Sequence, residues 1–394
     1  MTDMTDHEIR ALAEKQLEWA VALRRRLHRV PEPGNQEFET QKIITGALDE
    51  LGIEYTTENT WTVGLIRGAH PGQTVAFRAD IDALPVEEPE TCPFRSTHPG
   101  MMHACGHDAH TAILLGAAAI LNGMKDELHG NVKLLFQPAE ETEGGAERMV
   151  KAGVMENPHV DHVYGLHVMP RLPVGTVETR RGTLNASTDS ITLAVHGVSG
   201  HGAYPESGRD AIVCAAQIIT ALQTLVSRNL SPLSSAVLSI GKIEGGRASN
   251  IICDEVTMKG TLRTANAELR AMMKQRINEV VQGVAQAMGC TADVRIKPGY
   301  NALVNDLNEA ERVHQVGARL FGKEHMLEKA EPSMGAEDFS FFSDEAPGAF
   351  YHIGCVREDE LPAPPLHSRD FHIDESCMAI GMAMHVAMAL ESLR

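Results

Sequence analysis

The sequence predicts an α/β protein with a mostly parallel central sheet and a smaller α+β domain inserted into the chain. Short apolar runs bounded by turn residues alternate with longer segments of helical periodicity, which is the pattern of buried parallel strands and their covering helices. In the middle of the chain this order changes to strand, helix, strand, strand, helix, strand, the split βαββαβ arrangement of ferredoxin-like domains. The length of 394 residues has room for two domains.

The larger domain begins with two helices and continues with strands and helices in alternation. Apolar residues at helical spacing predict helices over 7–30, which Pro31 ends, and over 37–51, which Gly52 ends. Short apolar runs between polar residues predict three buried strands, at 74–78, 132–136 and 160–166. Helices are also expected at 109–121 and 145–152.

The inserted domain is predicted from its six consecutive elements. They are a strand at 190–196, a helix at 210–227, strands at 236–243 and 251–263, a helix at 267–288 and a strand at 291–296. After Gly299 the longer α/β pattern resumes and ends in a helix over 374–393. We therefore expect one domain from residues 1–184 and 300–394, and an inserted domain from residues 185–299.

Composition excludes several classes of protein. Hydrophobic residues make up 43% and charged residues 22%, as in an ordinary globular protein. The formal charge of −18 disfavours binding to nucleic acid or to an anionic membrane. The longest apolar run, residues 112–121, falls short of the roughly 18 residues that a membrane helix requires. The acidic start MTDMTDHEIR lacks the features of a signal peptide, and seven scattered cysteines suggest reduced thiols, so we expect a cytoplasmic protein.

Candidate metal donors lie at the ends of predicted strands and just before a predicted helix. Cys105 and His107 precede the helix at 109–121, Glu140 and Glu141 follow the strand at 132–136, and His167 follows the strand at 160–166. Taken singly, each has an ordinary interpretation: a buried Cys beside a capping His, or a solvated Glu-Glu loop. Taken together, they favour a ligand site, because open α/β sheets bind ligands at the carboxyl ends of their strands.

The types of donor indicate which cations would bind. Mixed Cys, His and carboxylate donors suit Zn²⁺, Co²⁺ or Mn²⁺ better than Mg²⁺ or Ca²⁺. Five donors exceed one tetrahedral site that also holds water, and they suit two metals with a bridging water. Asp80 and Asp82, which follow the strand at 74–78, are placed to orient a ligand His. His367 lies in a loop before the last helix, with His372 as its competitor.

Seven motifs carry a resemblance to a known family. In chain order they are FRADIDALPVEE, MHACGHDAHT, FQPAEE, GLHV, SGHGAYPE, GAEDF and PLHS. This series closely resembles the dimetal amidohydrolases that include hippurate hydrolase, N-acyl-amino-acid amidohydrolases and plant indole-acetyl-amino-acid hydrolases, over essentially the whole chain. The resemblance implies a zinc-peptidase-like catalytic domain with two divalent metal ions per subunit (Zn, Mn, Co or Ni). It also implies that the inserted domain is a lid that forms a homodimer, and it leaves a tetramer open.

The resemblance also assigns roles to residues. The metal ligands it implies are Cys105, His107, Glu141, His167 and His367. Glu140 is implied as the general base, and His201 as the residue that reaches the partner subunit's active site. Asn250 and Arg263 match positions of the lid near the substrate. The sequence departs from the family at Cys253, where the family usually has Pro, so the turn after Asn250 could be looser.

The implied reaction is hydrolysis of the amide bond of an N-acyl-L-amino acid by a metal-bridging water. Glu140 would take the proton of that water, His201 would stabilise the oxyanion, and Arg263 would bind the substrate carboxylate. Arg263 in a surface ion pair, His201 as a loop residue, and GAEDF as an ordinary loop instead of an acyl pocket remain alternatives. A carboxypeptidase or dipeptidase would use the same centre. A non-enzymatic binding protein is disfavoured because every implied ligand and Glu140 are present.

Overall fold

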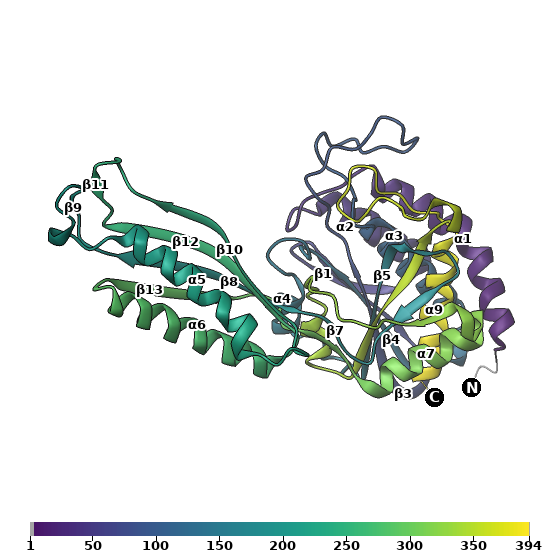
Figure 1. The fold of residues 1–394 in the computed structure, drawn as a ribbon. Coiled ribbons are helices and arrows are strands. Elements are labelled where there is room, and N and C mark those ends of the chain that lie inside the picture. The colour runs from purple at the N-terminus through teal and green to yellow at the C-terminus, as the bar shows by residue number, and fades with distance from the viewer. Residues whose placement is uncertain (1–3, 394) are drawn as a thin grey trace. The chain divides into compact units, whose positions relative to one another are not determined.

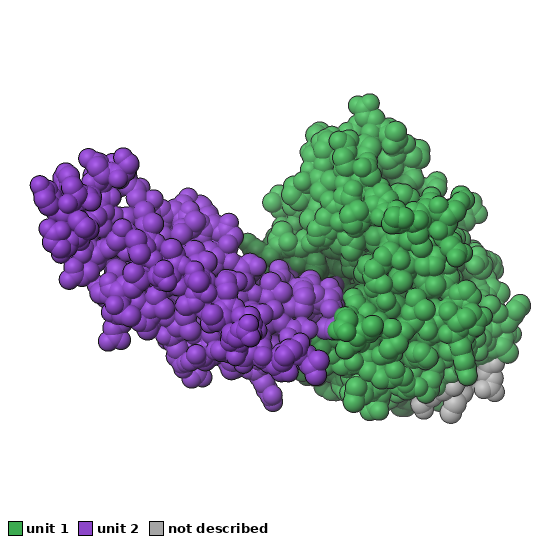
Figure 2. All heavy atoms as spheres, in the orientation of Figure 1, with its two compact units in different colours: residues 1–184, 304–331, 338–394 green, residues 185–303, 332–337 purple. Residues whose placement is uncertain are grey.

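The computed structural model describes residues 4–393 and divides the chain into two compact units (Figures 1 and 2). Unit 1 consists of Met1–Leu184, Val304–Glu331 and Asp338–Arg394, and unit 2 of Asn185–Leu303 and Pro332–Glu337. Each unit has its own cluster of buried apolar side chains. We therefore describe each unit by itself.

Unit 1 is built on an eight-stranded sheet in the order β1-β2-β4-β3-β5-β16-β6-β15. The strands are β1 (Glu54–Glu58), β2 (Trp61–Arg67), β3 (His70–Asp80), β4 (His129–Gln137), β5 (His162–Pro173), β6 (Val177–Thr179), β15 (Met326–Glu328) and β16 (Gly348–Val356). The central strands β4, β3, β5 and β16 run parallel to one another, whereas β2 joins β4 and β6 joins β16 antiparallel. The predicted α/β class with a mostly parallel sheet is confirmed.

Seven α-helices lie in the described part of unit 1. They are α1 (Asp6–His28), α2 (Phe38–Leu51), α3 (His107–Gly123), α4 (Ala146–Lys151), α7 (Leu307–Phe321), α8 (Ser340–Ser343) and α9 (Cys377–Ser392). A capping box of Thr5 and Glu8 starts α1, and Gly52 in the left-handed region ends α2. Helices α3 and α9 are buried on almost all sides, since they pack on the sheet, on each other and on α1.

The two faces of the sheet are covered by different helices. The ring of Phe77 on β3 lies 4.7 Å from that of His385 on α9. The next residue, Arg78, contacts Asp338, close to the start of α8. Because successive side chains of a strand point to opposite faces, α9 and the segment before α8 lie on opposite sides of β3.

Unit 2 is a four-stranded antiparallel sheet with two helices on it (Figure 1). Its elements are β8 (Ser187–His196), α5 (Ala211–Asn229), β10 (Ala236–Gly245), β12 (Glu255–Thr264), α6 (Ala267–Ala287) and β13 (Thr291–Pro298). The strand order β10-β12-β8-β13 is that of the split βαββαβ arrangement. Where the sequence suggests one strand at 251–263, the structure has β11 (Ile251–Ile252) and β12, separated by Cys253 and Asp254.

Short elements complete the description. Strand β11 pairs with β9 (Gly200–His201), and β14 (Leu303–Asn305) pairs with β7 (Gly182–Asn185). Single 3₁₀ turns occur at Lys125–Glu127, Pro205–Ser207, Lys323–His325 and Glu358–Glu360.

One helix among the described residues, α5, is long and apolar enough to cross a membrane by length and composition. Its buried residues, including Cys214, Ile218 and Leu222, face the core of unit 2. This one-sided burial is the arrangement of an amphipathic helix on a sheet.

Candidate metal centre

The predicted donors meet at the carboxyl end of the central strands of unit 1. Strand β3 ends at Asp80 and β4 ends at Gln137, shortly before Glu140 and Glu141. His107 is the first residue of α3, and Cys105 precedes it by two residues. Strand β5 continues beyond His167 to Pro173, because β16 pairs with it there, whereas the pairing of β3 with β5 ends at Arg78 and Gly165. His167 therefore lies within a strand, beyond the end of its neighbour β3.

Five donors converge within reach of one another. The sulfur of Cys105 lies 3.3 Å from His167 Nε2. Glu141 Oε1 lies 2.9 Å from His367 Nε2 and 4.0 Å from His107 Nε2. Donor atoms lie within 4.8 Å of one another in three overlapping groups, namely Cys105, His107 and His167, then Cys105, Glu141 and His367, then His107, Glu140 and Glu141. The overlap suits more than one cation.

The electrostatics of this cluster favour a cation. His107 Nε2 is buried and has no hydrogen-bond partner among the described residues. Burial opposes a charge on this ring, but Asp80 and Asp82 outweigh it and raise the pKa of His107 to about 10. Burial raises the pKa of the Cys105 thiol, and the neighbouring Glu141 and Glu140 raise it further. Without a metal these groups hold protons, and a divalent cation would replace that positive charge.

Asp82 positions two of the donors. Its Oδ1 lies 3.2 Å from His107 Nδ1, and its Oδ2 accepts a hydrogen bond of 3.0 Å from the backbone N–H of Glu141. The carboxylate on Nδ1 leaves His107 Nε2 directed at the cluster, as in most metal-bound histidines.

Asp80 makes a different contact from the one that the sequence suggests. Its Oδ1 lies 2.6 Å from His110 Nδ1, and its Oδ2 is 3.5 Å from His107 Nε2. His110 Nε2 accepts a hydrogen bond of 2.9 Å from the backbone N–H of Val168. His110 therefore links Asp80 to the residue after His167, and both of its ring nitrogens are engaged.

A buried ionic network lies behind Asp80. Arg78 donates to Asp80 Oδ2 at 2.7 Å, to Gln137 Oε1 at 2.7 Å and to Asp338 Oδ1 at 3.0 Å. Arg78, Asp80 and Asp338 are almost completely inaccessible to solvent. Asp338 also accepts from the Gln137 amide and from the backbone N–H of Ala146. Asp338 of GAEDF therefore anchors its loop to the sheet.

Backbone conformation places two of the donor loops. Ala139, just before Glu140, and His367 both adopt positive φ, 58° and 65°, which non-glycine residues rarely do. Glu37 accepts the backbone N–H of Ala139 at 2.9 Å, and His367 donates its backbone N–H to Ala104 O at 2.9 Å. Gly106, with φ 87°, passes so close to Val168 that a Cβ would lie 2.4 Å from its side chain. These contacts bring the His367 and Cys105 segments together.

Comparison with known proteins identifies the family. The model of peptidase family M20/M25/M40 matches residues 76–391. The chain belongs to this family. It is therefore a hydrolase.

Relatives of this M20/M25/M40 protein include two enzymes with different names. It is 41% identical over 367 residues to the N-acetyl-L-cysteine deacetylase of Bacillus subtilis, covering 93% of this chain and 85% of the relative. It is 37% identical over 380 residues to thermostable carboxypeptidase 1 of Saccharolobus solfataricus, covering 95% of each chain. Among solved structures, the Bacillus subtilis YXEP protein, a dinuclear metal-binding peptidase of family M20, matches with a TM-score of 0.84 and 34% identity over 96% of this chain and 99% of that one.

Three predicted residues of this M20/M25/M40 hydrolase lie in unit 2, apart from the five donors, which all lie in unit 1. His201 on β9 is exposed, and its Nδ1 accepts the backbone N–H of Ala203 at 3.0 Å. Asn250 lies beside it, since its carbonyl accepts the N–H of Gly202 at 2.8 Å. Arg263 is half-buried near the end of β12, paired with Thr188 and Val237.

The turn that contains Cys253 is held without proline. The Cys253 thiol donates to Glu255 O at 2.9 Å, and its carbonyl accepts the N–H of Ala211 at 2.9 Å. The side chain is buried in the core of unit 2. These bonds hold the turn in place, whereas the sequence suggested a looser turn.

Two other features of unit 1 lie outside the donor cluster. His372, the competitor of His367, is exposed and lies 3.6 Å from Glu360.

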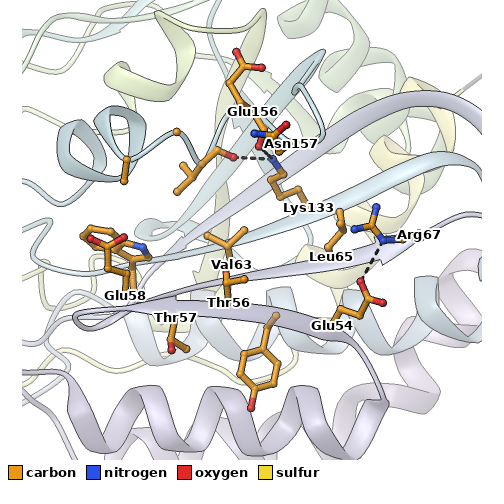
Figure 3. Close-up of a pocket in the computed structure, with 15 residues that line it drawn as sticks. Glu54, Thr56, Thr57, Glu58, Val63, Leu65, Arg67, Lys133, Glu156 and Asn157 are labelled. Carbon is orange, nitrogen blue, oxygen red and sulfur yellow. Dashed lines mark hydrogen bonds and ion pairs between the residues drawn. The ribbon is translucent and has the colours of Figure 1, made fainter.

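A groove of about 540 Å³ beside β1 and β2 contains none of the donors (Figure 3). Its Lys133 donates to three carbonyls, those of Val154, Glu156 and Pro158, at 2.7–2.9 Å, and burial lowers the pKa of this lysine to about 8. The three hydrogen bonds of this ammonium group therefore hold the loop at residues 154–158.

Proposed function

We propose that this hydrolase cleaves the amide bond of N-acyl-L-amino acids and releases a carboxylic acid and a free amino acid. The observation that carries the proposal is the convergence of Cys105, His107, Glu141, His167 and His367, with Glu140 beside them. The name of the N-acetyl-L-cysteine deacetylase, 41% identical over 93% of this chain, supports this choice of substrate.

The five donors would hold two divalent cations, of which Zn²⁺, Mn²⁺, Co²⁺ and Ni²⁺ are the candidates. The buried His107 Nε2, which has no hydrogen-bond partner among the described residues, supports this fit, and so does the description of the YXEP protein as a dinuclear metal-binding peptidase. When bound, two cations supply a water of lowered pKa and polarise the substrate carbonyl. Asp82 would keep His107 and Glu141 oriented toward them.

Glu140 is the residue to which we assign proton transfer. Its carboxylate lies within 4.8 Å of the donor atoms of His107 and Glu141, and only 9% of the residue is exposed. Neighbouring side chains point in different directions, so Glu141 can bind a cation while Glu140 faces the attacking water. Glu140 would take a proton from that water and deliver it to the leaving nitrogen.

We propose unit 1 as the catalytic domain and unit 2 as a lid that also forms a homodimer; a tetramer stays open. His201 would enter the partner subunit's site and stabilise the oxyanion, while Asn250 and Arg263 would contact the substrate. The exposure of His201 and of Ile212 and Val213 on α5, 48% and 45% exposed, supports a role for unit 2 in association.

The second candidate is a carboxypeptidase or dipeptidase. A peptide is itself an N-acyl amino acid, so the same centre would cut it. The 37% identity to thermostable carboxypeptidase 1, over 95% of both chains, favours this alternative specifically.

We also place the enzyme in the cytoplasm. All seven cysteines are free in the described part of the chain, although most are buried.

A substrate panel tests the proposal. Protein loaded with Zn²⁺, Mn²⁺ or Co²⁺ is assayed against acetyl-, benzoyl- and indoleacetyl-amino acids beside dipeptides. We expect kcat/KM for at least one acyl amino acid to exceed that for every dipeptide. The reverse order would replace the proposal with the peptidase alternative, and a Glu140→Gln variant serves as the inactive control.

A further inference from the structure

A second cluster of metal-binding side chains lies in unit 1, formed by His28 at the end of α1 and by Glu88 and Cys92 in the segment after β3. His28 Nε2 lies 2.8 Å from Glu88 Oε1, and the donor atoms of all three residues lie within 4.8 Å of one another. His28 and Glu88 are buried, whereas Cys92 is half-buried. None of the three belongs to the five-donor centre.

The contact of His28 with Asp108 is of the kind that orients a metal-bound imidazole. Its other nitrogen, Nδ1, lies 2.8 Å from Asp108 Oδ2, and Arg24 donates to the same oxygen at 2.9 Å. Metal-ligating histidines characteristically donate their second ring N–H to a carboxylate in this way. Glu88 is fixed similarly, because its Oε2 accepts the backbone N–H of Ser96 at 2.6 Å and this leaves Oε1 toward His28.

His103 provides an independent observation. It is buried, and neither of its ring nitrogens has a hydrogen-bond partner among the described residues. Buried polar groups without partners are rare in folded proteins. The His103 ring centroid lies 6.2 Å from that of His28. Two imidazoles bound to one tetrahedral zinc, each by a bond of about 2.0 Å, place their centroids roughly 5 Å apart, so the two rings would move about 1 Å closer on binding.

We propose that His28, Glu88 and Cys92, with His103 as fourth ligand, form a third cation site that takes Zn²⁺ or Co²⁺. Mixed nitrogen, sulfur and carboxylate donors suit these borderline cations, and four protein ligands describe a closed structural site. The cation displaces the protons of His28 Nε2 and the Cys92 thiol. Donors at about 2.0 Å from a tetrahedral ion lie roughly 3.3 Å apart, so His28 Nε2 and Glu88 Oε1 separate by about half an ångström.

The position of this site gives it a structural role. It would tie the end of α1 to the segment between the bridge residues Leu84 and Met102, which has little regular structure of its own. Asp108, which orients His28, directly follows the ligand His107. Bound metal would therefore stabilise the segment that leads into the five-donor centre.

Metal counting tests the proposal. Wild-type protein, Cys92→Ala and the control Cys290→Ala are stripped with chelator, reloaded with Zn²⁺ or Co²⁺, desalted and analysed for metal. Cys290 is a buried cysteine of unit 2, outside both donor groups, and makes a matched control. We expect Cys92→Ala to hold one ion fewer per chain than wild type and Cys290→Ala, with hydrolytic activity retained. The Co²⁺ protein should lose about half of its thiolate-to-metal absorption, since Cys105 supplies the remainder.

The test compares the metal content of Cys92→Ala with that of wild type, and the expected difference is one ion per chain. This difference does not depend on the number of ions in the five-donor centre or on the substrate. Equal metal content in Cys92→Ala and wild type would overturn the proposal and leave His28 as an imidazolium bridging two carboxylates. If Cys92→Ala does not fold by circular dichroism, Glu88→Gln replaces it, with the same loss of one ion expected and the same equality overturning the site.

Discussion

Replacing Asp82 by Asn would disturb the orientation of the metal ligands His107 and Glu141 and leave both ligands in the chain. The Asp82 carboxylate accepts from the backbone N–H of Glu141 at 3.0 Å and lies 3.2 Å from His107 Nδ1. Its two oxygens serve two donors at once. An Asn side chain has the same shape but only one acceptor oxygen, so one N–H group would face an NH₂ group and lose its partner.

The expected loss follows from this count. Removing the carboxylate partner of a ligating histidine typically lowers metal affinity by about 10–100-fold. This corresponds to roughly 1.4–2.7 kcal/mol of binding free energy. Fully loaded Asp82→Asn protein should keep much of its activity, since the ligands and Glu140 are still present.

Competition between metal-free protein and a chromophoric chelator would measure this affinity. Asp161→Asn is the matched control, because its carboxylate accepts the backbone N–H of Thr74 at 2.8 Å, within β3 but away from the end of that strand at Asp80. We expect the control to bind metal like wild type. If Asp82→Asn matched the control within about twofold, the reasoning that the carboxylate positions His107 and Glu141 would be refuted.

Three further predictions concern the proton carrier, the dimer and pH. Glu140→Gln should retain metal but lose about 10²–10⁴ in kcat, whereas Glu141→Gln should lose metal; exchanged phenotypes in rate and elemental assays would reverse the two roles. The Glu140→Ala and His201→Ala variants should each be inactive. Dimers re-formed from a mixture of the two should regain about a quarter of wild-type activity, because about half of these dimers contain one chain of each kind and have one complete site of two. If mixed dimers form without any recovery of activity, His201 acts within its own subunit. Burial opposes a charge on Glu178, but its hydrogen bonds with His352 and Arg171 outweigh burial and lower its pKa to about 2. The ionised carboxylate therefore stabilises the fold above pH 4.5, and this stabilisation is lost as the pH falls toward 2. Glu178→Gln should cost up to about 3 kcal/mol in urea unfolding at pH 7 and much less at pH 3, and an equal cost at both would contradict the assignment.

The strands that carry the donors could be predicted because their signals are local. Apolar runs such as 132–136 predict buried strands, and Glu140 and Glu141 follow this run within a few residues. The edge strand β1 gives no such signal, since almost every residue of β1 is exposed and its composition is that of a surface loop.

Contacts between distant parts of the chain that no motif marks could not be predicted. Arg78 and Asp338 are 260 residues apart, and only the folded sheet brings this buried pair together behind Asp80. The preference of Asp80 for His110 over His107 depends likewise on where α3 packs against β3. His103 resembles an ordinary core histidine in the sequence, and its lack of a hydrogen-bond partner is visible only in the structure.

Turnover of metal-free protein is the measurement that tests the central claim most directly. The five donors are proposed to hold the cations on which amide hydrolysis depends, so chelator-treated protein should be inactive toward the acyl amino acids and dipeptides of the panel. Activity should return when divalent metal is added, and Cys105→Ala and His367→Ala should each lower the metal content. Full turnover by protein in which elemental analysis finds no metal would contradict the account.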